Sequence, residues 1–371
     1  MQVESVAGEE GLRALRDPWE ALVRRGAATT PFQSWATTYH AVRIDSGVIE
    51  PLILVAIEAD GSVAGLLPLG VRKQRRGPFA WRTLQTIGPK RLDFVDVIAT
   101  PALADDVVAA CIDWLASHWT KWDELSLSPL REDARLLVAL RRIEQSRPLA
   151  IAIEAVDENL ALEIPVIART WEDLLAGETR RTTRRIVKRL DASGFEVRRV
   201  SSGYPLEAAV DAFVDLHARR RGEFGQVSRY LDVDRSELCA LVASTVAEGG
   251  DLMLLEREGA PAAAQLTLRL GEHASHYRLA FDSEQRSFSP GIGLLAAGVN
   301  DAIRAGVREY DFGFGAEEYK RRWASVRRKV FRVRIANRHL GRMPRRAWSF
   351  AANTISRATR RSPRRARAIF A

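Results

Sequence analysis

The segment from Ser289 to Gly293, which reads SPGIG, places a proline and two glycines directly before a helix-like run. The apolar residues of that run recur at the spacing of one helical face, and they are Leu294, Leu295, Val299 and Ile303. The first N–H groups of a helix lack partners within the helix, and the helix dipole favours an anion beside them. The segment therefore indicates a site for a phosphate group, although an ordinary turn into a helix would suit the same residues.

Two strand-like runs flank this helix. The run from His276 to Phe281 precedes the turn, and the run that follows the helix ends in Asp311-Phe312-Gly313. The tripeptide Asp-Phe-Gly also occurs in protein kinases. The chain has neither an HRD-type loop nor a glycine-rich hairpin followed by a strand lysine, so we reject a kinase function. We expect instead a strand end that turns away from its neighbour, with Gly313 and Gly315 allowing the backbone to curve.

The elements that would position these residues occur twice along the chain, in the order helix, helix, hairpin, strand, helix, strand. In the first half the predicted elements are Leu12–Val23, Ser34–Val42, Pro51–Leu69, Phe94–Ala99, Val107–His118 and Glu124–Leu127. In the second half they are Leu206–Arg220, Arg235–Ala247, Asp251–Leu270, Ser275–Phe281, Leu294–Ala305 and Glu309–Phe312. A tandem duplication explains this order. We place its boundary within Val156–Ala168, which predicts domains at residues 1–165 and 166–336 and a tail at 337–371.

The two halves differ where the phosphate site is expected. The first half has Ile98 to Leu103 (IATPAL) in place of the SPGIG segment. Without a glycine the backbone of that turn cannot approach a pyrophosphate closely. We therefore interpret the first half as a degenerate copy and expect only the second half to bind a nucleotide-like cofactor.

Composition is that of a soluble globular protein, with 46% hydrophobic and 28% charged residues. The two cysteines, Cys111 and Cys239, lie far apart in apolar helical patterns, which favours buried free thiols in a reducing compartment. The first residues contain acids and no apolar core, unlike a signal peptide, and no apolar run has the roughly 18 residues that a membrane span needs. We expect a cytoplasmic protein.

The net charge of +9 is concentrated at the end of the chain. Residues 338–371 hold ten arginines and no acid, so the rest of the chain has 46 Lys and Arg against 47 Asp and Glu. This distribution argues against nucleic-acid binding by the body of the protein. Trp348, Ala351, Ile355 and Ala358 fall at helical spacing among these arginines. The tail is either solvated or a helix lying on an anionic membrane surface.

The second half resembles the GNAT acyltransferase superfamily, and more closely the CelD-type acetyltransferases associated with bacterial cellulose and other exopolysaccharide synthesis. The matching pieces are Thr179–Arg185, Leu216–Arg220, Ser289–Gly291, Asp311–Gly313 and Tyr319–Lys320. The paired halves are also similar to Fem-type aminoacyl transferases. The resemblance implies a mixed α/β fold with two tandem GNAT-like domains, the first degenerate.

The resemblance also implies that the cofactor is acetyl-CoA or another acyl-CoA, bound as a substrate. Its pantetheine arm would enter where the strand ending at Asp311-Phe312-Gly313 leaves its neighbour. The residues expected to hold it are Arg286, Ser289, Gly291, Ile292, Gly293 and Leu294. The GNAT loop has its Arg or Gln closer to the glycines than Arg286 is to Gly291, so Arg286 departs from the family pattern.

A tyrosine commonly protonates the leaving thiolate in this family, and Tyr319 matches by position, with Tyr310 as the competitor. An ammonium acceptor must lose a proton before it attacks, and His217 and Asp282 are the bases we select. His276, Glu317 and Glu318 remain open as alternatives.

Other candidates would contact the acceptor or a coenzyme phosphate. Three arginines of a basic amphipathic helix, Arg181, Arg184 and Arg185, could bind an anionic group through planar guanidinium forks, and Lys320 is assigned to the substrate as well. The same helix would also serve as a solvated surface helix. No His, Cys and carboxylate cluster has metal-ligand spacing, and we expect no metal.

The function that we predict is direct acyl transfer, most simply of acetyl, from acyl-CoA to an amine or hydroxyl of a small or saccharide acceptor. The resemblance to CelD-type enzymes implies a role in exopolysaccharide synthesis. The backbone N–H groups of His276–Phe281 would hold the oxyanion. One alternative is Fem-type transfer from aminoacyl-tRNA, which would need a larger basic surface. Another is a catalytically dead scaffold held at the inner membrane face by the tail.

Overall fold

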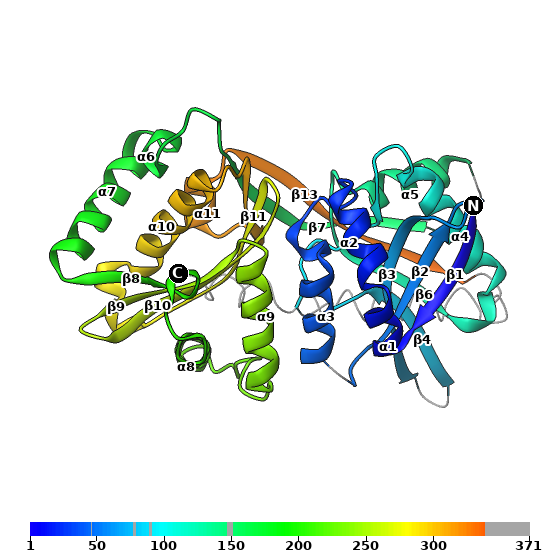
Figure 1. Ribbon diagram of the computed structural model, residues 1–371, viewed down its shortest axis with the longest axis horizontal. Helices are drawn as coiled ribbons and strands as arrows, with labels where there is room; N and C mark the ends of the chain where they lie inside the picture. Colours follow the sequence, from blue (N-terminus) through cyan, green and yellow to red (C-terminus); the bar gives the residue numbers. More distant parts are fainter. Residues whose placement is uncertain (46, 77–78, 89–90, 147–150, 338–371) are drawn as a thin grey trace.

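The computed structural model describes residues 1–45, 47–76, 79–88, 91–146 and 151–337, which form two successive sets of helices and strands on one large sheet. Figure 1 shows the first set (blue to cyan) and the second set (green to orange) as two halves that meet along helices and two central strands. Apart from Asn337, the predicted tail lies outside the described residues.

Both sets follow the order strand, helices, three strands, helix, strand, helix, strand, and the first set has one further two-residue strand at Ile98–Ala99. The first set is β1 (Gln2–Ala7), α1 (Gly8–Ala14), α2 (Arg16–Arg24), α3 (Trp35–Ile44), β2 (Glu50–Ile57), β3 (Val63–Arg76), β4 (Phe79–Thr86), β5 (Ile98–Ala99), α4 (Ala104–Ser117), β6 (Glu124–Arg131), α5 (Arg135–Ser146) and β7 (Ile151–Glu163). The predicted duplication of elements is therefore present, with additional strands at both ends of each set.

The second set begins with two helices that have no described counterpart before β1. It comprises α6 (Trp171–Leu174), α7 (Gly177–Ala192), β8 (Phe195–Arg199), α8 (Leu206–Gly222), α9 (Arg235–Ala247), β9 (Asp251–Arg257), β10 (Ala260–Leu270), β11 (His273–Phe281), α10 (Pro290–Arg304), β12 (Glu309–Phe314), α11 (Glu318–Trp323) and β13 (Val326–Ala336). Single 3₁₀ turns occur at Pro31–Gln33, Trp119–Lys121, Val200–Ser202 and Ser283–Phe288.

The sheet has an approximate symmetry about its centre. Its strand order is β1-β2-β3-β4-β6-β13-β7-β12-β11-β10-β9-β8, with β5 paired to β3. Each set therefore contributes its last strand to the other half: β13 pairs with β6, β7 pairs with β12, and β7 and β13 pair with each other, all antiparallel. The exchange joins the two halves through backbone hydrogen bonds, and the domain boundary between residues 165 and 166 stays a prediction.

Several predicted elements of the first half need correction. Of the strand expected at Phe94–Ala99, only Ile98–Ala99 pairs as a strand, and Phe94 itself adopts a left-handed conformation with φ of 53°. The third long strand of that half is β4 instead. The helix expected at Leu12–Val23 is divided into α1 and α2, with Leu15 in a non-helical conformation between them.

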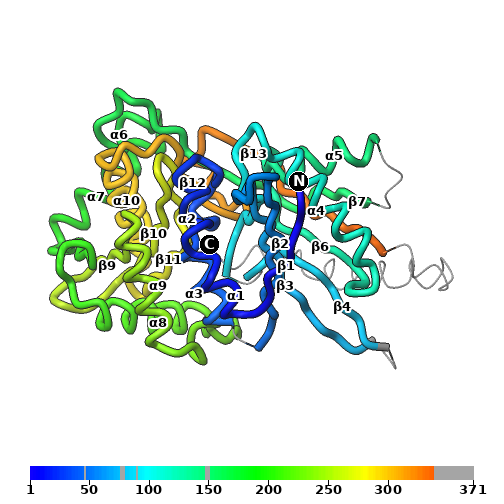
Figure 2. The backbone as a smooth tube through the Cα atoms, turned by 45° about the vertical axis from the view of Figure 1, so that its right-hand side comes forward, coloured from blue at the N-terminus to red at the C-terminus, as the bar shows by residue number. Residues whose placement is uncertain are grey.

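Helices cover both faces of the sheet. On one face α1, α2 and α3 share a continuous core with α8 and α9, in which Trp19, Phe32, Val210 and Leu252 are buried. Figures 1 and 2 both show α3 beside α9, where the two sets meet. On the other face α4 and α5 cover the first half, and α6, α7, α10 and α11 cover the second. None of the described helices combines the length and the apolar character that crossing a membrane requires.

Candidate functional site

The opening between β11 and β12 defines the candidate site. The two strands pair in parallel only from His273 to Ser275 on β11 and from Glu309 to Asp311 on β12. Beyond these pairs β11 continues along β10 to Phe281, while β12 follows β7 and leaves β11. The predicted divergence at Asp311-Phe312-Gly313 is confirmed.

Buried polar contacts hold β12 in this divergent path. Asp311 pairs with Arg131 of β6 at 3.3 Å and accepts a hydrogen bond from the side-chain amide of Asn159 on β7 at 2.6 Å. Asn159 also donates to the carbonyl oxygen of Gly313 at 3.1 Å. Burial raises the pKa of the Asp311 carboxyl, while Arg131 and the backbone N–H of Gly313 act in the opposite direction. Strands from both sets thus shape the opening.

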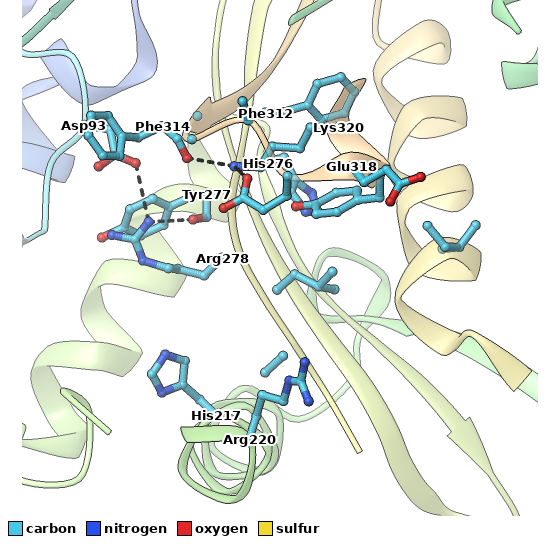
Figure 3. Close-up of a pocket in the computed structure, with 18 of the residues that line it drawn as sticks. Asp93, His217, Arg220, His276, Tyr277, Arg278, Phe312, Phe314, Glu318 and Lys320 are labelled. Atoms are coloured by element: carbon cyan, nitrogen blue, oxygen red, sulfur yellow. Dashed lines mark hydrogen bonds and ion pairs between the residues drawn. The ribbon is translucent and has the colours of Figure 1, made fainter. Parts of the chain in front are cut away.

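A cavity of about 1650 Å³ lies at this opening and reaches both faces of the sheet. On the side of α7 and α10 its walls include Thr182, Ile186, Ser289 and Ile292. On the side of α8 they include His217, Arg221, Arg229 and residues of the first set. Figure 3 shows His217 and Arg220 projecting from α8 across the cavity from His276 and Lys320.

The SPGIG segment lies at the start of α10, as predicted. Ser289 precedes the helix in a left-handed conformation with φ of 57°, and Pro290 is its first residue. The N–H groups of Ile292 and Gly293 donate to the carbonyl oxygen of Ser289 at 3.1 and 3.3 Å. Only Ser289 and Ile292 of the predicted cofactor residues line the cavity.

The glycines of this segment have packing roles. A Cβ on Gly293 would overlap the end of the Leu190 side chain on α7, so glycine at this position favours the close packing of α7 against α10. A Cβ on Gly291 would lie 3.2 Å from Cδ2 of Leu279 on β11. Leu294 is fully buried in a core that includes residues of β9 and β10. Gly291 and Gly293 therefore allow α10 to pack closely against β11 and α7, and Leu294 anchors the helix in the core.

The predicted basic residues of α7 and of the turn before α10 lie outside the cavity lining. Arg184 pairs with Glu172, and Arg181 pairs with Glu178 at 3.1 Å, all on the exposed surface. Arg185 and Arg286 are exposed too. The binding roles predicted for these four arginines stay predictions.

His276 and Tyr319 face each other at the point where the strands diverge. Their ring centroids are 6.3 Å apart, and His276 also approaches Phe312 at 6.3 Å. His276 is 4% exposed, and neither of its ring nitrogens has a hydrogen-bond partner among the described residues. Burial and the charge of Lys320 lower the pKa of His276 to about 3, so its ring is neutral at pH 7.

Tyr319 and Lys320 both line the cavity from α11. Burial, together with Glu317 and Tyr310, raises the pKa of the Tyr319 hydroxyl well above its usual range, so this hydroxyl holds its proton. The ammonium of Lys320 donates to the carbonyl oxygen of Phe314 at 2.8 Å and lies 2.7 Å from Glu317. Lys320 therefore ties α11 to the end of β12.

The two predicted bases lie in different surroundings. His217 lines the cavity from α8, and its Nδ1 is 2.7 Å from the hydroxyl of Ser228. Burial and four nearby arginines lower its pKa to about 3. Asp282 lies outside the cavity lining, where it accepts from the N–H of Glu284 at 3.0 Å and pairs with Arg219 at 3.3 Å. Through these contacts Asp282 caps the 3₁₀ turn Ser283–Phe288.

A β-bulge in β11 places the guanidinium group of Arg278 on the α8 side of the cavity. His276 lies opposite Thr267 and Arg278 opposite Leu266, so Tyr277 is the extra residue. As a result Tyr277 and Arg278 both lie on the α8 face, where the Arg278 guanidinium stacks 3.8 Å from the Tyr277 ring centre. Figure 3 shows Arg278 extending toward Asp93.

The first set contributes residues to this cavity that no sequence pattern indicates. Asp45, Arg91 and Asp93 come from the end of α3 and from the segment after β4, yet they line the cavity beside Arg278. Arg278 lies 3.5 Å from Asp93, and Tyr277 donates through its hydroxyl to the carbonyl oxygen of Arg91. A single sequence has no local signal for these contacts, because they depend on how two distant segments pack.

The corresponding opening of the first set is bridged. There β4 and β6 pair in parallel from Thr83 to Gln85 with Glu124 to Ser126, as β11 and β12 do. The next residue of β4, Thr86, donates through its hydroxyl to the carbonyl oxygen of Ser128 at 2.8 Å. This bond links β4 to β6 at the level where, in the second set, β11 and β12 have separated. Among the described residues, no group of His, Cys, Asp and Glu is arranged to hold a metal ion.

Comparison with known proteins supports this geometry. Residues 177–321 match the family model of the acetyltransferase (GNAT) domain. The fold is similar to that of FemX, with a TM-score of 0.62, 13% identity and coverage of 88% of this chain and 97% of that chain. No curated protein matches the chain.

Two further solved structures are similar over most of their length. One is the C-terminal domain (DUF2156) of a proposed lysylphosphatidylglycerol synthetase from Agrobacterium fabrum, with a TM-score of 0.56, 11% identity and coverage of 87% of this chain and 92% of that chain. The other is L-PGS from Bacillus licheniformis, with a TM-score of 0.54, 10% identity and coverage of 85% and 90%. At these identities the likeness concerns the fold. The second set is thus a GNAT acetyltransferase domain, and the protein is an acyltransferase of GNAT fold.

Proposed function

We propose that the protein transfers an acyl group, most simply acetyl, from acyl-CoA to the amine or hydroxyl of a small or saccharide acceptor. The observation that carries this proposal is the cavity through the divergent strands β11 and β12, beside the start of α10, in a segment that matches a GNAT domain. The opening reaches both faces of the sheet, so the two substrates can approach each other from opposite sides.

The residues at the opening fit an acyl-CoA. Ser289 turns the chain into α10 at the cavity wall, where the helix dipole favours the negative charge of a pyrophosphate. Beyond Ser275, β11 makes no pair with β12, which leaves that edge of β11 facing the cavity. Backbone N–H groups on this edge would stabilise the oxyanion of a thioester under attack.

Tyr319 is the residue that we assign as the acid. It lies on α11 beside the opening, and its raised pKa keeps the hydroxyl protonated at working pH. The attacking nitrogen or oxygen forms a bond to the acyl carbon, the carbon–sulfur bond breaks, and Tyr319 gives its proton to the departing thiolate. Its phenolate would be reprotonated through solvent.

His276 is the residue that we assign to the acceptor proton, in place of Asp282. Its neutral ring has two buried nitrogens without partners, so one of them can accept the hydrogen bond of an amine or hydroxyl. His217 is a second candidate on the α8 side, although its Nδ1 already contacts Ser228. Proximity of the two bound substrates would supply much of the rate.

The finer expectations remain proposals. A role in exopolysaccharide synthesis depends on the resemblance to CelD-type enzymes, and peripheral membrane contact depends on residues 338–371, which lie outside the described residues. Fem-type transfer from aminoacyl-tRNA is a second candidate, favoured by the similarity to FemX across most of both chains. A dead scaffold would bind no acyl-CoA.

The decisive experiment is calorimetric titration of the full chain with acetyl-CoA. We expect one binding site per chain, and no binding at millimolar ligand would refute the proposal. Ser289→Glu places a negative charge at the cavity wall and should weaken binding at least tenfold. The matched control is Ser287→Glu, because Ser287 is exposed two residues earlier and lies outside the lining. Equal affinities of the two variants would move the cofactor elsewhere.

A further inference from the structure

Four arginines gather on the α8 side of the cavity, and they come from both sets of elements. Arg221 lies at the end of α8, Arg229 in the following segment, Arg278 on β11, and Arg91 after β4. All four line the cavity and act together on His217, lowering its pKa. None of these residues belongs to α10 or to the turn before it, where the pyrophosphate of acyl-CoA is expected.

The arginines are held in place by specific contacts. Arg91 is 6% exposed, pairs with Asp45 at 2.9 Å and donates to the carbonyl oxygen of Arg229 at 3.0 Å. One of its terminal nitrogens, Nη1, is buried without a partner among the described residues. Arg278 donates to the hydroxyl of Tyr230 at 3.1 Å.

The cluster carries more positive than negative charge. Its four guanidinium groups face two carboxylates of the cavity wall, Asp45 and Asp93, a local excess of two positive charges. Arg221 bonds a neutral partner, the side chain of Gln226, at 2.6 Å. Burial, Arg229 and Arg278 lower the pKa of Arg221, as expected where like charges crowd together in a partly desolvated site.

We propose that Arg91, Arg221, Arg229 and Arg278 bind a phosphate monoester carried by the acceptor. This inference rests on the proposed acyl transfer and adds the chemical class of the acceptor. A phosphate monoester carries about −1.5 to −2 charges at pH 7, which matches the local excess. Guanidinium groups bind phosphate oxygens through paired hydrogen bonds, and the buried Nη1 of Arg91 offers one such donor.

The geometry separates the two substrates. The bulge at Tyr277 sends Arg278 to the α8 face, whereas Ser289 and Ile292 line the cavity from the opposite side of the sheet. An acceptor anchored by its phosphate at the arginine cluster would extend its amine or hydroxyl toward His276 at the opening. The cluster thus fixes one end of the acceptor while β11 presents the reacting end.

The test titrates inorganic phosphate into the full chain already saturated with coenzyme A, so that the coenzyme site is filled. We expect one phosphate per chain, and Arg221→Gln should weaken it at least about tenfold by removing a charge-assisted donor. Arg219→Gln is the matched control, because Arg219 lies on the same helix, is exposed and lies outside the cavity lining. It should leave the phosphate affinity unchanged within twofold.

Other outcomes overturn the proposal in distinct ways. Phosphate that binds the free chain but not the chain filled with coenzyme A would assign the arginines to the coenzyme. Acetate that binds as tightly as phosphate would point to a carboxylate acceptor, and equal loss in both arginine variants would indicate a diffuse charge effect. If coenzyme A itself fails to bind, the proposed acyl transfer is refuted, while phosphate titration of the free chain still decides the anion site.

Discussion

The carboxylate of Asp311 accepts a hydrogen bond from the backbone N–H of Gly313, 2.6 Å away and two residues further along β12. The bond closes a tight turn in which Gly313 has a φ of 76°, a conformation that favours glycine. Because β12 leaves β11 directly after Asp311, this local bond and the Arg131 pair together set the opening that the function requires.

Replacing Asp311 with Asn should destabilise the protein by about 2–3 kcal/mol. Arg131 would lose one buried charged partner and keep the other two, Glu309 at 3.1 Å and Asp133 at 3.0 Å. Urea unfolding of the variant measures this loss, with the exposed Asp232→Asn as control. A loss no larger than that of the control would show that the turn holds without this ion pair.

His276→Leu should raise stability by about 1 kcal/mol and remove most of the turnover. The buried ring has two nitrogens without partners, which cost folding free energy that an apolar side chain would not. His273→Leu is the matched control, because His273 lies on the same strand, has a buried Nδ1 without a partner and lies outside the cavity lining. Full turnover in His276→Leu would exclude the assigned role.

Tyr319→Phe should lower kcat by roughly 100-fold with little change in KM for acetyl-CoA, because the hydroxyl acts on the leaving group. The control is Tyr310→Phe, the competing tyrosine. Its hydroxyl accepts from the side chain of Gln265 at 3.0 Å, is fully buried and lies outside the cavity lining. That variant should lose about 1 kcal/mol of stability and keep its turnover. The reverse pattern would transfer the acid role to Tyr310.

The sequence predicts the elements of the second set well because their signals are local. The apolar face of α10, the helix-starting Pro290 and the glycines after Asp311 each depend on residues close together along the chain. The last strand, β13, is missed because five of its eleven residues are arginine or lysine, and these lie among the buried Val330, Val333 and Ile335. Its central place in the sheet comes from pairing with β6 and β7.

The site is predicted less completely than the fold, and the reason is again distance along the chain. Five of the residues selected from the sequence line the cavity, and their roles stay predictions: Ser289, Ile292, His217, Tyr319 and Lys320. Arg278 reaches it only because of the bulge at Tyr277, and Arg91 only because the first set packs against the second. Neither a bulge nor an interface between repeats has a signature in one sequence.

Glu248 should make the contact between the two sets sensitive to pH. It lies at the end of α9 and accepts a hydrogen bond from Ser34, the first residue before α3, at 3.0 Å. Burial raises the pKa of Glu248 to about 7, so the folded protein holds a proton there that the unfolded chain releases near pH 4.5. A raised pKa of this kind contributes stability that is present below pH 4.5 and is lost as the pH rises through 7.

Glu248→Gln keeps an acceptor for Ser34 and removes the ionisation. We expect the variant and the parent to be equally stable at pH 4, and the variant to be more stable at pH 8 by roughly 3 kcal/mol, as a shift of this size implies. Urea unfolding at both pH values measures the difference, and Glu10→Gln, an exposed change on α1, controls for the loss of one negative charge. A difference that is the same at both pH values would mean that Glu248 ionises alike in the folded and unfolded chain, and the contact between α3 and α9 would then be independent of this carboxyl.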